Sequence, residues 1–435
     1  MSAIARSDDL RRQNQGRILT ALRRKAPLSR TELSAATGLS ASTVTAITAL
    51  LIASGTLIET HPVDSSDASL SRRGRPQVAL SFNPDYASIA VISYSLNRVS
   101  AALVDYSGEV RAEQVIRLET RKASSLDIVN AISRVLDLAI AEAITKGPLL
   151  HIAVGVQGVV DAAGKTVLWT PIQSSLDVPL ASLLVERYHV PVSLANDCSM
   201  IAEALRWQSP SLYGNSFGAV LLSHGIGMGL FLKGHLFSGI GSSATEFGHM
   251  NHIPHGASCR CGGKGCIEAY AGDYGIWRLA HEMPADTPPK NDLQMLDMKG
   301  LADRARASDG PERAAYRAAG LAIGSGLKSM FALFDPFPVA FAGSGAAAFD
   351  LMEDAIREAL GDQAIGMATP KVEMRCYPDE FPLVRLGCAM TALVYLDANE
   401  LLAPDQSHKA GKLVEYADVN DREAEMKDKD MQHAC

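Results

Sequence analysis

The sequence predicts an α/β fold in two parts, a small N-terminal domain of helices with a β-ribbon and a larger body in two lobes. Residues 14–55 carry apolar side chains at helical spacing, separated by cap and turn residues. From residue 88 onward, three strand patterns follow one another before helix and strand alternate, and a second copy of that order opens at Ala219. Charge also differs between the two parts. Residues 1–80 hold 11 Lys and Arg against 6 Asp and Glu, a net charge of +5, whereas the whole chain has a net charge of −7.

Composition excludes several classes of protein. No apolar run approaches the roughly 20 residues of a membrane span, and the N-terminus lacks a signal-peptide core, so we expect a cytoplasmic protein with no membrane partner. Three of the seven cysteines fall within residues 259–266 and the others are scattered, which is typical of a reducing compartment. A basic head on an acidic body is expected where only one domain contacts nucleic acid.

The N-terminal residues predict three helices. The first covers residues 14–25, and the second begins at Ser29, whose side chain can form a capping box with Glu32. Residues 37–39 form a turn, and Ser40 can cap a third helix that ends at Gly55. The predicted inward stripe of the third helix is Val44, Ile47, Leu50 and Leu51.

Helix, short turn and helix predict a helix-turn-helix whose third helix enters the major groove of DNA. Residues 56–60 and 77–82 are strand-like and flank a polar loop, which makes the domain a winged helix. The alternative is a small helical bundle that never contacts DNA. The predicted outer face of the third helix holds no Arg or Lys, so it offers hydroxyl and methyl contacts in place of bidentate contacts to guanine. That face is Ser40, Ala41, Ser42, Thr43, Thr45 and Thr48.

Positive charge for DNA binding must therefore come from outside the third helix. The sources are the cluster at residues 23–25, Arg30, and the wing segment at residues 71–76, whose Arg-Gly-Arg-Pro resembles the core of an AT-hook. The alternative for the wing segment is a flexible basic linker. The predicted DNA-contacting residues are Arg30, Ser40, Ser42, Thr43, Thr45, Arg72, Arg73 and Arg75.

Residues 246–268 predict a metal site. Cys259, Cys261 and Cys266 fall within eight residues, His249 lies ten residues before the first of them, and interposed glycines allow the sulfurs to converge. Three thiolates and one imidazole form a closed tetrahedral zinc site of the structural type. The alternative is a dense but metal-free cluster of buried cysteines.

The same stretch, Glu-x-Gly-His followed by Cys-x-Cys-Gly-x-x-Gly-Cys-x-Glu, resembles the signature of the ROK family (repressor, open reading frame, kinase). Its members are sugar kinases and sugar-linked transcriptional repressors. The resemblance implies an actin-like ATPase fold with two ribonuclease-H-like lobes, in which zinc orders a wall of the sugar pocket. It also implies a sugar-binding set of Asn196, Asp197, Glu246, His249 and Glu268.

Ionised carboxylates suit a sugar because they accept hydrogen bonds from hydroxyl groups strongly. In the kinases the residue matching Asp197 is the general base that takes the proton from the attacked hydroxyl. The alternative is that these carboxylates brace the zinc loop and bind no ligand. Two departures from the family pattern, Gln157 and the run at residues 169–175, indicate an altered pocket.

The phosphate loop of the family's kinases is missing. Where they carry Asp-x-Gly-Gly-Thr, this sequence has Ser-Tyr-Ser-Leu-Asn at residues 93–97. The carboxylate that helps hold magnesium is absent, and Leu96 stands where the backbone should approach phosphate. Later glycine loops survive in part at residues 223–229 and 342–345. We therefore predict no catalytic residue and no enzymatic activity.

The predicted domains are a winged helix-turn-helix at 1–82, a first lobe at 83–198 joined by a helix near 385–403, a second lobe at 199–384, and a polar tail at 404–435. The predicted function is a transcriptional regulator, a repressor of carbohydrate uptake or catabolism genes, which binds an operator in double-stranded DNA and a sugar or sugar derivative between the lobes. We expect it to form a homodimer or a higher homo-oligomer. The alternatives are a sugar kinase with an added DNA-binding head and a regulator controlled by a protein partner.

Overall fold

A computed structural model of the chain describes residues 7–60, 78–172, 179–242, 245–290, 293, 295–361, 363–364, 367–368 and 372–399. Met1–Tyr395 forms one compact unit, and Leu396–Cys435 is grouped as another. Three of the predicted DNA-contacting residues, Arg72, Arg73 and Arg75, lie outside the described residues, as does the predicted tail at 404–435.

The N-terminal domain has the predicted winged helix-turn-helix architecture. Its helices surround a small core built on Ile18, Leu33 and Leu51, and its three-stranded sheet has the order β1-β3-β2 with antiparallel pairs. The elements are α1 (Ser7–Arg24), β1 (Leu28–Ser29), α2 (Arg30–Thr37), α3 (Ala41–Ala53), β2 (Leu57–Thr60) and β3 (Ala79–Phe82).

Local hydrogen bonds fix the ends of these helices as the sequence predicts. Glu32 N donates to Ser29 Oγ at 3.3 Å and Ser29 N donates to Glu32 Oε2 at 2.8 Å, which completes the capping box of α2. Gly38 ends α2 with a φ of 70°, a left-handed conformation that favours glycine. Ser40 caps α3 by accepting a hydrogen bond from Thr43 N at 3.2 Å.

The predicted inward stripe of α3 is wrong at one position. Leu50 is 47% exposed, whereas Thr48, which was predicted to face outward, is fully buried. The buried side chains Val44, Ile47, Thr48 and Leu51 follow the i, i+3, i+4, i+7 spacing of one helix face. Thr48 Oγ1 donates to Val44 O at 2.8 Å, so its hydroxyl is satisfied inside the domain.

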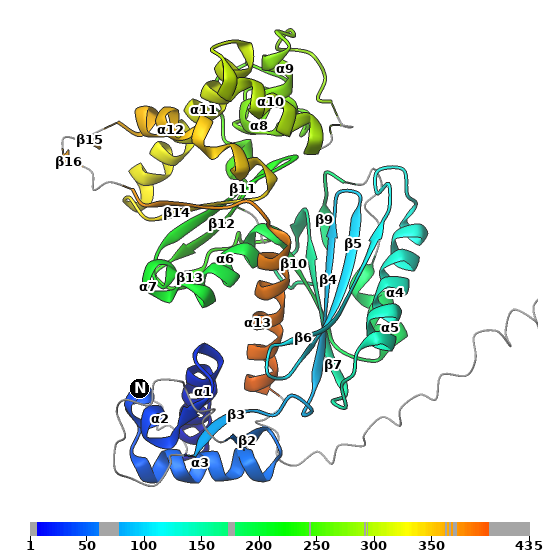
Figure 1. The fold of residues 1–435 in the computed structure, drawn as a ribbon, viewed down its shortest axis with the longest axis vertical. Coiled ribbons are helices and arrows are strands. Elements are labelled where there is room, and N and C mark those ends of the chain that lie inside the picture. Colours follow the sequence, from blue (N-terminus) through cyan, green and yellow to red (C-terminus); the bar gives the residue numbers. More distant parts are fainter. Residues whose placement is uncertain are drawn as a thin grey trace, which may run out of the picture. The chain divides into compact units, whose positions relative to one another are not determined.

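The first lobe is a five-stranded sheet with the order β10-β7-β4-β5-β6. Strands β4, β5 and β6 pair antiparallel, and β4, β7 and β10 pair parallel. Helices α4 (Ser125–Glu142) and α5 (Leu180–Tyr188) cover one face, and α13 (Phe381–Asn399) lies on the other (Figure 1). The strands are β4 (Ser88–Ser95), β5 (Arg98–Asp105), β6 (Val110–Arg117), β7 (Leu149–Val156) and β10 (Val192–Asn196).

The second lobe repeats this topology, with the strand order β13-β12-β11-β14-β17. Strands β11, β12 and β13 pair antiparallel, and β11, β14 and β17 pair parallel, like their counterparts in the first lobe. The duplication confirms the predicted two-lobed fold. One face of this sheet packs on α6 (Asp197–Gln208), and the other carries a large hydrophobic core cluster. Its strands are β11 (Phe217–Leu222), β12 (Ile226–Leu232), β13 (His235–Leu236), β14 (Val339–Ala342) and β17 (Met374–Tyr377).

Shorter elements and the remaining helices complete the second lobe and the connections. A short hairpin of β8 (Val159–Val160) and β9 (Val167–Trp169) follows β7. The others are α7 (Pro210–Tyr213), η1 (Phe247–His249), α8 (Glu268–Ala271), α9 (Asp273–Ala280), α10 (Met295–Ala307), α11 (Pro311–Phe334), η2 (Ser344–Leu351), α12 (Glu353–Leu360), β15 (Gln363–Ala364) and β16 (Met367–Ala368).

One side of helix α13 packs into the protein core, where Leu383, Cys388 and Leu393 are buried. Its window Phe381–Ala398 has a mean hydropathy of 1.3, which meets the length and composition of a membrane span, yet 56% of that window is buried inside the protein. A Cβ at Gly155 of β7 would lie 2.7 Å from Val384 and 3.2 Å from Cys388 Sγ, so the glycine allows α13 to approach the sheet closely. Such burial is ordinary for the core helix of a soluble domain.

Candidate functional site

The predicted metal ligands come together in the loop between β13 and α8. The ligand atoms of His249, Cys259, Cys261 and Cys266 all lie within 4.8 Å of one another. Cys261 Sγ is 3.8 Å from Cys266 Sγ, and Cys259 Sγ is 3.7 Å from His249 Nδ1. In a tetrahedron with Zn–S bonds of about 2.3 Å, neighbouring sulfurs lie roughly 3.8 Å apart, so the donor set and its spacing fit zinc.

Electrostatics keep these thiols neutral unless a cation is bound among them. Burial and then the neighbouring Cys259 and Cys261 raise the pKa of the Cys266 thiol. Three thiolates cannot share so small a volume unless a positive ion compensates their charge. The cluster could therefore hold a metal ion.

The two nitrogens of His249 point to different partners. Nδ1 faces the sulfurs, while Nε2 lies 3.6 Å from Glu246 Oε2. A metal-bound imidazole usually directs its second nitrogen to a carboxylate, which fixes the ring and its tautomer. Glu246 is exposed, so its carboxylate can support the ligand and still meet a molecule in solvent.

Glu268 is the most constrained member of the predicted sugar set. It is only 6% exposed, and its Oε2 accepts a hydrogen bond from Ile226 N at 3.1 Å. Its Oε1 accepts from the Tyr274 hydroxyl at 3.2 Å and lies 3.9 Å from Cys259 Sγ. Glu268 therefore contacts both the start of β12 and the cluster of His249 and cysteines. Tyr274 was not among the predicted site residues, because nothing in its sequence context marks a partner of the cluster.

Asn196 and Asp197 occupy the junction of β10 and α6. Asn196 Oδ1 caps α6 by accepting from Ser199 N at 3.1 Å, and its Nδ2 donates to Gly158 O at 2.7 Å. Asp197 Oδ1 accepts from Cys198 N at 2.8 Å, and no residue of the described chain bonds to Oδ2. One oxygen of this half-buried carboxylate is therefore open to a ligand.

The two halves of the predicted sugar set are close to each other. Ile226 N binds Glu268, and the adjacent Gly227 approaches Cys198 closely, so the start of β12 lies beside both Glu268 and the start of α6. The charge of Glu246 also contributes to the raised pKa of Cys198, behind burial and the adjacent Asp197. A Cβ at Gly227 would lie 2.4 Å from Cys198 Sγ, so this glycine allows α6 to lie against β12.

Three carboxylates near this junction have raised pKa values, and burial is the first cause for each. The pKa of Asp197 rises to about 6, that of Asp273 to about 6, and that of Glu380 to about 7. Asp197 and Asp273 are among the further causes for Glu380, so the three groups lie near one another. Sequence reasoning missed Asp273 and Glu380, because their burial results from packing between distant segments.

The backbone donors of the turn at residues 95–98 are engaged within the protein. Leu96 N donates to Gln157 Oε1 at 3.1 Å, and Asn97 N donates to Thr120 Oγ1 at 3.2 Å. Leu96 packs against the core of the first lobe. The backbone N–H groups at this turn are therefore committed to the protein itself.

The described DNA-contacting candidates divide into two groups. Ser40, Ser42 and Thr45 are exposed on α3, and Thr43 is half-buried. Arg30, by contrast, donates to Glu59 Oε1 at 2.9 Å and to Thr48 Oγ1 at 3.2 Å. That ion pair fixes the guanidinium on the domain, so Arg30 is a weaker candidate for DNA contact than its charge suggested.

Arg23, another expected source of positive charge, is held against the first lobe. Its guanidinium lies 3.6 Å from the ring centroid of Phe82 and 4.5 Å from that of Tyr106. It also donates a hydrogen bond to Tyr106 O. Cation–π contact on both rings gives Arg23 a role in joining α1 to the turn after β5.

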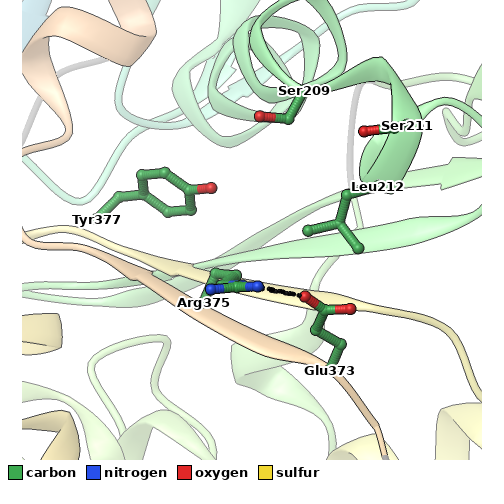
Figure 2. A pocket seen from close by; sticks show the side chains of 6 residues that line it. All are labelled: Ser209, Ser211, Leu212, Glu373, Arg375 and Tyr377. Carbon is green, nitrogen blue, oxygen red and sulfur yellow. Dashed lines mark hydrogen bonds and ion pairs between the residues drawn. The ribbon is translucent and has the colours of Figure 1, made fainter.

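A pocket of about 530 Å³ lies apart from the predicted site, beside the edge strand β17 (Figure 2). Arg375 Nη2 is 2.7 Å from Glu373 Oε1 within it, and the Tyr377 hydroxyl lies 3.3 Å from that of Tyr213. None of the predicted site residues lines it. The lining residues are Ser209, Ser211, Leu212, Glu373, Arg375 and Tyr377.

Comparison with known proteins shows which families the two parts of the chain resemble. The model of the ROK family matches residues 92–376, and a model of winged helix-turn-helix DNA-binding domains matches residues 11–58. The chain is 28% identical over 338 residues to a protein from Bacillus spizizenii named xylose repressor, covering 77% of this chain and 82% of that protein. It is 26% identical over 369 residues to the DNA-binding transcriptional repressor Mlc of Escherichia coli, covering 82% and 87%.

A solved structure has the same fold across the head and the body. The crystal structure of a ROK family transcriptional regulator, described as a homolog of the Escherichia coli Mlc protein, aligns with a TM-score of 0.71 at 21% identity. The alignment covers 90% of this chain and 99% of that one.

Proposed function

The chain belongs to the ROK family, and from this we propose that it is a DNA-binding transcriptional regulator, a repressor of carbohydrate uptake or catabolism genes that responds to a sugar or sugar derivative. The observation that carries the proposal is the presence, in one chain, of a winged helix-turn-helix and a kinase-like body that brings His249 and three cysteines together. The relatives named xylose repressor and repressor Mlc support the same reading.

The sugar is proposed to bind at Asn196, Asp197, Glu246, His249 and Glu268. The open oxygen of Asp197 and the exposed carboxylate of Glu246 supply acceptors for hydroxyl groups. His249 and Glu268 are held by the zinc loop, so they would present fixed polar atoms with little entropic cost on binding. Residues 1–82 would be the DNA-binding head, with residues 83–198 and the helix near 385–403 in one lobe and residues 199–384 in the other.

We further propose that the body is not an active kinase. Phosphoryl transfer depends on backbone donors and a metal-binding carboxylate at the first hairpin. At this hairpin the N–H groups of Leu96 and Asn97 are engaged by Gln157 and Thr120, and Ser93 stands where a carboxylate is needed. Asp197 would then serve as a ligand acceptor and not as a general base.

Zinc is the proposed resident metal, held by His249, Cys259, Cys261 and Cys266. When bound, it supplies the positive charge that allows three thiolates to share one site and cross-links the loop. The chain's own residues do the rest, because Glu246 orients the imidazole and Glu268 connects the loop to β12.

For DNA, the proposed contacts are the exposed hydroxyls of α3 and the wing residues Arg72, Arg73 and Arg75, with a lesser part for Arg30. Two half-sites one helical turn apart require two DNA-binding heads, so we propose that a homodimer binds the operator. We also propose that it acts in the cytoplasm. Sugar binding would change its DNA affinity only if the two conformations of the dimer bind sugar differently.

The first test is a thermal-shift screen of the full chain against monosaccharides, amino sugars and their phosphates. A stabilising sugar should lose its effect in Asp197→Ala and Glu268→Gln and keep it in Glu203→Ala. Glu203 also lies on α6 but pairs with Arg206 at 2.9 Å, so it is a matched control. No stabilisation by any sugar, with DNA binding retained, would move the proposal to control by a protein partner.

The second test addresses DNA and catalysis. Selection from a random duplex library should yield a two-fold symmetric sequence, and the selected duplex should form a complex with two chains by light scattering. The stabilising sugar should change the affinity for that duplex. ATP-dependent phosphorylation of the same sugar at a rate typical of kinases would refute the assignment as a regulator without enzymatic activity.

A further inference from the structure

One large aromatic side chain at the proposed sugar site has no role in the assignments above. Trp169 ends β9, and its indole lies edge to face with the His249 ring, with 6.3 Å between centroids and 81° between planes. It is half-buried, so part of the indole remains in contact with solvent. No residue of the described chain accepts a hydrogen bond from its Nε1, and that atom is not among the buried unpaired ones.

The backbone around Trp169 is rigid and connects to the other half of the site. Val159 pairs with Trp169 across the β8–β9 hairpin, and Thr170 Oγ1 donates to Gln157 O at 2.6 Å. A Cβ at Gly158, where φ is 153°, would lie 2.3 Å from Trp169 O, so only glycine permits this approach. The same Gly158 accepts the hydrogen bond of Asn196 Nδ2 through its carbonyl at 2.7 Å.

Trp169 therefore joins the two halves of the polar set. Its ring contacts His249 of the zinc loop, and its backbone contacts Gly158, which is hydrogen-bonded to Asn196 at the start of α6. Polar side chains beside a half-buried aromatic residue on a fixed backbone are the usual composition of a small-ligand site. A pyranose ring matches this composition, since its hydroxyls radiate from the edge and its C–H groups form an apolar face.

We propose that Trp169 is a sugar-binding residue, and that its indole stacks on the C–H face of a pyranose whose hydroxyls bind Asp197, Glu246 and His249. This inference rests on the proposed sugar-binding function and narrows the class of ligand, because a stacking indole favours a closed sugar ring over an open-chain polyol. An alditol keeps the carbon chain of the parent sugar and gains one hydroxyl where the ring oxygen was, but it has no ring and so no flat C–H face. Glucose against sorbitol and xylose against xylitol are the matched probes.

The chain contains three tryptophans, which makes a direct reporter available. In Trp207→Phe/Trp277→Phe the remaining emission comes from Trp169. Trp207 lies under Arg206 and Arg24, and Trp277 stacks on His281, so neither belongs to the site. Titration of this double variant with the sugar that stabilises the wild-type chain should change Trp169 emission over the same concentration range as the thermal shift, whereas the alditol should leave the emission unchanged.

Substitution of Trp169 itself separates binding from packing. Trp169→Leu keeps apolar volume and should weaken sugar binding about tenfold or more, while Trp169→Phe should recover part of the affinity, because only an aromatic ring stacks. Zinc content and melting temperature without sugar should stay close to wild type in the Phe variant. A purely structural Trp169 would instead lower both in the Leu variant and leave the affinity of the folded fraction unchanged.

The outcomes distinguish the two proposals. Sugar stabilisation of the wild-type chain with no change in Trp169 emission, or with equal affinity in Trp169→Leu, would overturn the stacking role and leave the sugar-binding function standing. Equal affinity for glucose and sorbitol would also overturn it. If no sugar stabilised or bound the wild-type chain, the function and the role of Trp169 would fall together.

Discussion

Neutralising Asp197 should make the protein more stable at neutral pH. Burial raises the pKa of this carboxyl from 3.8 to about 6, so the folded chain binds the proton more tightly than the unfolded chain does. Its contribution to stability is then fully present below about pH 4 and is lost as pH rises through about 6. In Asp197→Asn the side chain stays neutral, and this loss disappears.

The magnitude follows from the shift. About two pKa units correspond to roughly 3 kcal/mol as an upper limit. Because the carboxylate is half-buried and one oxygen reaches solvent, we expect about 1–2 kcal/mol. Glu380 adds to the effect in the same direction, since the charge of Asp197 contributes to its pKa of about 7 and the substitution removes that repulsion.

The assay is urea unfolding of the wild-type and variant chains in parallel from pH 4 to pH 8. The quantity of interest is the difference between the two chains at each pH, because protonation of His249 and the clustered cysteines is common to both chains and cancels. Parallel stability curves, or a difference that shrinks toward pH 8, would refute the reasoning. Asp350→Asn is the control of opposite sign, since the hydrogen bond from Arg306 lowers the pKa of Asp350, and neutralising it should cost up to about 1 kcal/mol at neutral pH.

Three further predictions concern the cysteine cluster, the contact of α1 with the first lobe, and the DNA-binding helix α3. Cys261→Ser should lose about one zinc ion per chain by elemental analysis and lower the melting temperature, whereas Cys376→Ser, an exposed thiol outside the cluster, should change neither. Arg23→Ala should speed hydrogen exchange in residues 78–106 by removing its contacts with Phe82 and Tyr106, while Lys25→Ala, which is exposed, should not. Thr45→Ala should weaken DNA binding in a mobility-shift assay by up to about tenfold without changing the melting temperature, and an unchanged affinity would remove α3 from the interface.

Local signals in the sequence predicted local structure well. The capping box at Ser29 and the cap at Ser40 are confirmed because each depends on residues within one helical turn. The His249 and cysteine cluster is confirmed as a convergent group, since its members lie within 18 residues joined by glycines. The three-strand order at residues 88–117 is confirmed for the same reason, as hairpins connect neighbours in the chain.

Distant contacts could not be predicted in this way. Arg23 was expected to face DNA, but its hydrogen-bond partner Tyr106 is 83 residues away, and no periodicity links the two. The prediction that Thr48 faces outward was wrong because threonine is usually counted as a polar residue. Its hydroxyl donates to a carbonyl of its own helix, which allows the whole side chain to be buried. The raised pKa of Asp273 depends on burial produced by the assembled lobe, which composition does not encode.

If His249 binds the proposed metal and contacts the proposed sugar, metal retention and effector binding are linked through a thermodynamic cycle. Nδ1 faces the thiols and Nε2 faces Glu246, so the same ring would lie between the proposed metal ion and a sugar bound to Glu246. If a sugar binds more tightly when the ion is present, the ion must be held more tightly by the same factor when the sugar is present. Chelator-driven release of the ion should therefore slow as sugar is added, which would let the cell's zinc supply and its carbohydrate supply act on one regulator together.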